Sequence, residues 1–117
     1  MIATLLALAI AALHVWILIM EMVLWETPRV RRAFGTSEEF AAATKVLAAN
    51  QGLYNGFLAA GLVFGVVQGE AGRGVVAFFL VCVVVAGLYG AATASRRILF
   101  VQALPAALAL AALTARI

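Results

Sequence analysis

Four long apolar segments make up most of the chain, and short polar stretches separate them. They cover residues 2–25, 40–67, 74–94 and 98–115. A helix needs about 20 apolar residues to cross a bilayer, and each segment is close to that length or longer. Because the connections are short, the pattern predicts an all-α fold, a four-helix transmembrane bundle in up-down-up-down order. We expect a single integral membrane domain over residues 1–117.

The composition supports a membrane location, since 67% of the residues are hydrophobic and only 11% are charged. Ordinary soluble domains are about 45–50% apolar and about 25% charged. The first apolar run reaches Trp25, which is longer than the apolar core of a signal peptide, so we predict that it spans the membrane. The net charge of +3 comes from arginines in short loops, which argues against a nucleic-acid partner.

The basic residues predict the orientation of the bundle. One side would carry Arg29, Arg31, Arg32, Lys45, Arg96 and Arg97, and the other only Arg73 and Arg116. Basic residues are enriched in cytoplasmic loops, so both termini should be non-cytoplasmic. We expect a multi-pass protein of the bacterial cytoplasmic (inner) membrane. Thr27-Pro28 should end the first helix, and Ser37 is placed to cap the second.

Two ionisable residues lie on one face of the first helix. Glu21 is predicted about one turn inside the cytoplasmic end, and His14 lies closer to the bilayer centre. Carboxylates within a membrane are rare and are usually functional, so Glu21 is a candidate catalytic acid or base, with His14 as its partner. The alternative is that Glu21 pairs with Arg29, Arg31 or Lys45 near the interface, and that His14 is a satisfied core residue.

Amide and phenol groups are predicted at a similar depth on the other helices. We interpret them as substrate-binding residues that could orient a ligand or stabilise charge on oxygen. They are Asn50, Gln51, Tyr54, Asn55, Tyr89 and Gln102. The structural alternatives are an interfacial position for Tyr89, a helix–helix contact for Gln102, and a hydrogen-bonded packing network for the rest. Gly52 and Gly56 predict a close helix contact, within the bundle or between subunits.

The chain resembles a small bacterial membrane family, the DUF1304 family, whose name states no activity. The resemblance rests on three features: the string at residues 50–56 with the residues that follow it, the polar residues of the first helix, and the first loop. The matching positions are His14, Glu21, Trp25, Thr27, Pro28, Phe34, Gly35, residues 50–59, Gln102 and Pro105.

A fainter likeness is to the styrene oxide isomerases, four-helix membrane enzymes that use haem to rearrange epoxides. They carry a similar Asn-Gly string, which matches residues 52–56 here. In those enzymes a histidine just before the string binds the iron, but the corresponding position here is near Asn50. No cofactor or metal is therefore predicted; in the haem alternative, His14 would be the ligand.

The leading hypothesis is a polar pocket in the cytoplasmic half of the bundle. It would bind a small hydrophobic molecule or lipid that carries a polar group, and acid–base chemistry of the isomerase or epoxide-opening type is possible within it. One alternative is a transporter or proton-relay subunit; another is a non-catalytic membrane assembly protein. The small size and the Gly52/Gly56 edge also predict a homo-oligomer.

Overall fold

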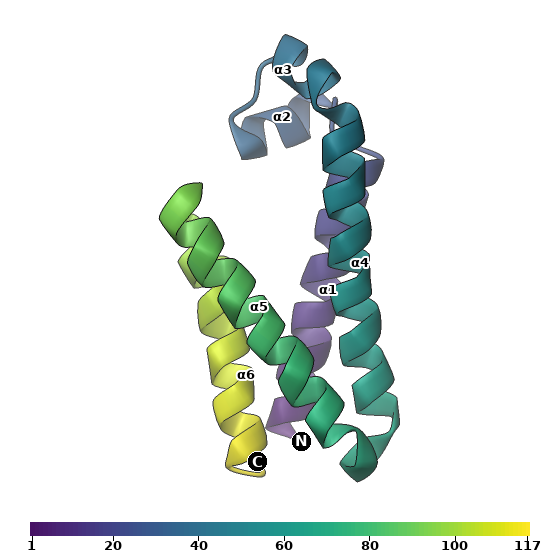
Figure 1. Ribbon diagram of the computed structural model, residues 1–117, viewed down its shortest axis with the longest axis vertical. Helices are drawn as coiled ribbons and strands as arrows, with labels where there is room; N and C mark the ends of the chain where they lie inside the picture. The colour runs from purple at the N-terminus through teal and green to yellow at the C-terminus, as the bar shows by residue number, and fades with distance from the viewer. The chain divides into compact units, whose positions relative to one another are not determined.

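The computed structural model describes residues 1–117, which form helices and no strands. The helices are α1 (Ile2–Met22), α2 (Pro28–Phe34), α3 (Glu38–Ala43), α4 (Lys45–Val67), η1 (Gly69–Gly72), α5 (Arg73–Thr93), η2 (Leu99–Ala103) and α6 (Leu104–Thr114) (Figure 1). The element η1 is a 3₁₀-helix and η2 is a π-helix. The all-α class predicted from the sequence is confirmed.

Two helical stretches are long and apolar enough to cross a bilayer, Ile2–Met22 and Gly69–Thr93. A third apolar stretch, Leu99–Thr114, is shorter. The helix α4 has 23 residues but is not among the candidate spans. Its three amide side chains, at positions 50, 51 and 55, lower its mean hydropathy. Length and composition thus point to a membrane protein with fewer evident spans than the four predicted.

The first helix ends at Met22, three residues before the predicted end at Trp25. Pro28 disfavours a helical conformation for Thr27, which is extended with φ −70° and ψ 148°. The chain therefore turns between Met22 and Thr27, where the hydroxyl of Thr27 donates a 2.7 Å hydrogen bond to the carbonyl of Leu24.

The segment predicted as a polar loop contains a short helix, α2. Thr27 is its N-cap and Pro28 occupies its first turn, where a missing N–H costs nothing. The predicted cap at Ser37 is present, since its Oγ accepts a hydrogen bond from Phe40 N at 3.1 Å. It caps α3, which Thr44 separates from α4, so the predicted segment 40–67 starts as two helices.

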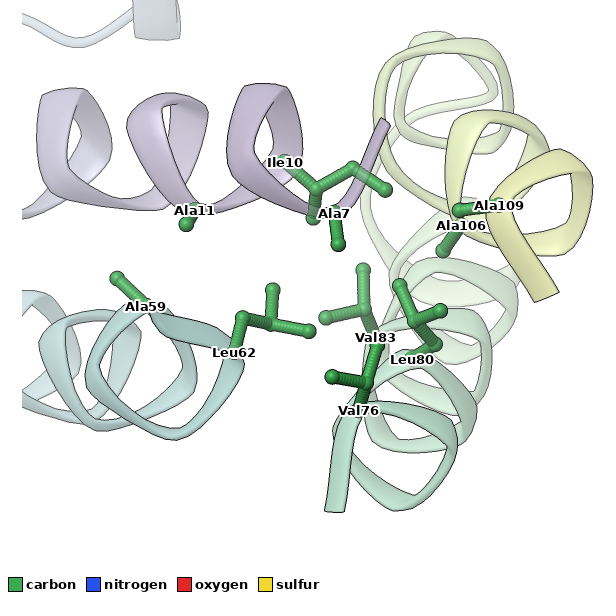
Figure 2. Close-up of a cluster of buried hydrophobic side chains, with 10 residues drawn as sticks. All are labelled: Ala7, Ile10, Ala11, Ala59, Leu62, Val76, Leu80, Val83, Ala106 and Ala109. Atoms are coloured by element: carbon green, nitrogen blue, oxygen red, sulfur yellow. The ribbon is translucent and has the colours of Figure 1, made fainter. Parts of the chain in front are cut away.

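The chain divides into two compact units, and the first comprises Met1–Ala12 and Leu58–Ile117. Its core is built largely from small and branched apolar side chains, which allow helices to approach closely (Figure 2). They are Ala7, Ile10, Ala11, Ala59, Leu62, Val76, Leu80, Val83, Ala106 and Ala109. One close approach joins α5 to η2, because a Cβ added at Gly87 would lie 2.6 Å from the backbone nitrogen of Ala103.

The π-helix η2 directly precedes a proline. Pro105 has no N–H and cannot donate to the carbonyl one turn earlier. The residue before it, Leu104, donates its N–H to the carbonyl of Leu99, five residues back, which is the π-helix pattern. The two ends of the chain also meet in this unit, where Ala3 N donates to Ile117 O at 3.1 Å (Figure 1).

The second unit, Leu13–Phe57, contains the end of α1, the helices α2 and α3, and the start of α4. Three contacts hold its chain reversal together. Trp25 Nε1 donates to Thr44 Oγ1 at 3.2 Å, and the Trp25 ring packs edge-on against Phe34 with centroids 5.0 Å apart. Lys45 pairs with Glu26 at 3.2 Å. These contacts fix the end of α1 beside the start of α4.

Candidate functional site

A carboxyl–amide pair joins α1 to α4. Asn55 Nδ2 donates a 2.8 Å hydrogen bond to Glu21 Oε1 and a second, at 3.0 Å, to the carbonyl of Gln51 on its own helix. Both side chains are half-buried. Glu21 lies in the last turn of α1, so the pair is at the end of an apolar span rather than at its middle.

Glycines on α4 explain why this pair can form. A Cβ added at Gly52 would lie 2.7 Å from Met22 Cγ and 3.1 Å from Glu21 Cβ, so only glycine permits this separation. At Gly56 an added Cβ would meet Leu18 Cδ1 at 2.6 Å. The predicted close contact is confirmed, and it lies within the chain. It brings the amide of Asn55 within hydrogen-bond distance of the carboxyl group.

The same geometry determines where the other α4 side chains point. At about 100° per residue, Asn55 lies about 60° from Gly52, whereas Asn50 and Tyr54 lie about 160° from it. Asn50 and Gln51 are exposed, and Tyr54 is 55% exposed. Asn50 Nδ2 donates to the carbonyl of Val46 at 2.9 Å. Of the four polar side chains in this stretch, the structure brings only Asn55 to Glu21.

The position of Asn50 and Gln51 along the helices, relative to the end of α1, explains why they are exposed. Since Gly52 packs against Met22, the last residue of α1, Asn50 and Gln51 lie level with or beyond the end of the apolar helix. Water and headgroups are available at that level, so exposed amides there cost little compared with amides in hydrocarbon. The sequence alone places these side chains deeper, because it predicts that the first helix continues to Trp25.

The remaining predicted residues lie elsewhere. His14 is completely buried on α1, two turns from Glu21, which is about 10 Å along the helix axis. Tyr89 on α5 is 72% exposed, and Gln102 is half-buried in η2. Both belong to the first unit, whereas Glu21 and Asn55 belong to the second. No group of three or more His, Cys, Asp or Glu side chains is placed to hold a metal ion.

Lys45 was one of three basic residues considered as partners for Glu21, but it pairs with Glu26. Arg31, another, donates from Nε to the carbonyl of Glu26 at 3.2 Å. The carboxyl group of Glu21 is therefore held by an amide and by no cation.

A groove of about 420 Å³ lies between α1 and α2. Its apolar walls are Trp16 and Met20 from α1, Leu24 from the turn that follows, and Val30 and Ala33 from α2. Thr27 and Arg29 are the polar residues that line it. Sequence reasoning did not find this groove, although the alternation of Val30 and Ala33 with arginines was a signal that α2 has an apolar side.

Comparison with known proteins places the chain in a family. A family model described as "Protein of unknown function (DUF1304)" matches residues 8–114. The chain belongs to the DUF1304 family. A relative, "Uncharacterized protein YpaA" of Lactococcus lactis subsp. lactis (strain IL1403), is 29% identical over 107 residues, which is 90% of each chain. No solved structure matches the chain.

The DUF1304 match includes the whole second unit, with the Glu21–Asn55 pair and the groove between α1 and α2. Neither the description of the family nor the name of the relative states an activity. Arguments about function in this family therefore rest on the chemistry of the sites themselves.

Proposed function

We propose that this DUF1304 protein is a multi-pass protein of the bacterial cytoplasmic membrane that binds a small, mostly apolar molecule through the Glu21–Asn55 pair. The two apolar helical stretches support the membrane location. The contact between Ala3 and Ile117 supports an even number of crossings, because chain ends that meet must lie on one side of the bilayer.

The observation that carries the proposal is the 2.8 Å hydrogen bond from Asn55 Nδ2 to Glu21 Oε1. It fixes the orientation of the carboxyl group and occupies one of its two oxygens. The other oxygen, Oε2, has no hydrogen-bond partner in the chain and is not enclosed. An ionisable group held at the end of an apolar span, with one oxygen free, is suited to bind the polar group of an otherwise apolar molecule.

The proposed chemistry at this site is proton transfer. Glu21 would give or take the proton at Oε2, while Asn55 holds the carboxyl group in position. Isomerisation and epoxide opening are reactions that a single positioned carboxyl group can assist in this way. Since His14 lies about 10 Å away along α1, Glu21 alone is assigned the proton-transfer step.

Native mass spectrometry of protein released from membranes tests binding. The wild type should carry a small apolar molecule, and Glu21→Leu should lose it because no polar partner remains. Gln51→Leu is the matched control: this α4 side chain is exposed and does not reach Glu21, so the variant should retain the molecule. Equal retention by Glu21→Leu, or a wild type that carries no such molecule, would contradict the proposal.

Once the molecule is known, Glu21→Gln separates binding from chemistry. Glutamine keeps the oxygen that accepts the bond from Asn55 but cannot transfer a proton at neutral pH. We expect a folded protein that binds the molecule and does not convert it. Unchanged turnover would remove Glu21 from the chemistry.

A further inference from the structure

The groove between α1 and α2 has the properties of a site for one hydrocarbon chain. Trp16 and Met20 are four residues apart, so they form one row on α1, about 6 Å apart along the axis, and Leu24 follows in the turn after Met22. Val30 and Ala33 close the opposite side, and Val30 is only 2% exposed. The wall of the groove is therefore largely apolar, and part of it lies on the C-terminal turns of a candidate spanning helix.

A single cation, Arg29, lines this groove. Thr27 is the other polar residue of the lining. Its hydroxyl group donates a hydrogen bond to Leu24 O and accepts one from Val30 N. The side chain of Arg29 makes no hydrogen bond and no ion pair within the chain. Its guanidinium group is thus the one polar group of the groove whose hydrogen-bonding capacity is unused.

We infer that the groove binds one acyl chain of an anionic phospholipid, whose phosphate pairs with Arg29. The guanidinium fork matches two phosphate oxygens, and the apolar row would cover the chain that hangs from the headgroup. Basic pockets beside membrane helices on the cytoplasmic side bind anionic headgroups by this chemistry. The site is separate from the Glu21–Asn55 pair and extends the proposed function, with which it shares only the membrane location of α1.

The two tryptophans of the chain provide a direct test. In a Trp25→Phe background the only remaining indole is Trp16, which lines the groove. The protein is placed in nanodiscs of phosphatidylcholine to which dibrominated phosphatidylglycerol or dibrominated phosphatidylcholine is added, and bromine quenching of Trp16 reports chain occupancy. We expect the anionic lipid to be preferred by about fivefold, the selectivity of one arginine near a membrane surface.

Arg29→Gln should abolish this preference. Arg32→Gln is the matched control, because Arg32 is an exposed residue of the same helix and does not line the groove. It should leave the preference intact. Ala33→Leu keeps every charge but narrows the groove, and it should reduce quenching by both lipids.

Three results would overturn the inference. Equal quenching of the parent by the two lipids would mean that Arg29 selects no phosphate. An equal loss in Arg29→Gln and Arg32→Gln would assign the preference to the general charge of α2. Absence of quenching by either lipid would mean that another part of the protein or a second copy fills the groove.

Discussion

Replacing Gly52 by alanine tests the close packing of α1 and α4 on which the Glu21–Asn55 pair depends. The added methyl group would lie 2.7 Å from Met22 Cγ, 3.1 Å from Glu21 Cβ and 3.2 Å from the carbonyl oxygen of Leu18. The last two atoms are on or next to the α1 backbone and cannot rotate away. The helices must therefore separate by a few tenths of an ångström.

The expected cost follows from two opposing effects. Overpacking a tight contact costs about 1–3 kcal/mol. Alanine in place of glycine in a helix interior returns about 0.5–1 kcal/mol. The net effect of Gly52→Ala should be a loss of about 1 kcal/mol in the free energy of unfolding.

Gly56→Ala is the matched control on the same helix face. Its added methyl group would meet Leu18 Cδ1, the tip of a flexible side chain that can change rotamer. We expect this variant to be close to the parent in stability. Reversible unfolding in mixed micelles, followed by far-ultraviolet circular dichroism, measures both. If Gly52→Ala is as stable as Gly56→Ala, the described contact between α1 and α4 is wrong.

Three further predictions concern individual contacts. A double-mutant cycle of Glu21→Leu and Asn55→Leu should give a coupling energy of about 0.6 kcal/mol in the same unfolding assay, the average for hydrogen bonds between membrane helices, and no more than about 1.7 kcal/mol; additive effects would show that the pair does not form. Gly87→Ala should destabilise the protein by about 1 kcal/mol or more, because its methyl group meets the backbone of η2, and a more stable variant in thermal unfolding would argue against this contact. Lys45→Gln should change stability by less than about 1 kcal/mol, since Lys45 and Glu26 are 66% and 46% exposed; a larger loss that persists at high salt would contradict a screened surface pair.

The periodic part of the structure could be predicted from the sequence. The apolar runs gave the helical class, and Ser37 gave the start of α3, because both depend on local pattern and local hydrogen bonding. The helix α2 was missed because its three arginines and its proline are also typical of a polar loop. Its existence depends on a cap at Thr27 and on the burial of Val30, which is a tertiary effect.

The candidate site was predicted only in part, because side-chain direction depends on which edge of α4 meets α1. The sequence identified Gly52 and Gly56 as a contact edge. Helical spacing from that edge would have directed Asn50 and Tyr54 away from Glu21 and left Asn55 beside it. Predicting a polar layer from depth alone overlooked this constraint.

The most direct test of the proposed site is chemical labelling of Glu21 in intact membranes. Dicyclohexylcarbodiimide is an apolar reagent with a polar reactive centre, and it modifies carboxyl groups that it reaches from the lipid phase. Peptide mass spectrometry should locate the label on Glu21, whereas a water-soluble carbodiimide should label the exposed carboxylates Glu26, Glu38, Glu39 and Glu70 instead. Glu21 left unmodified by the apolar reagent, or modified equally by both, would mean that its carboxyl group is not the membrane-facing binding group described here.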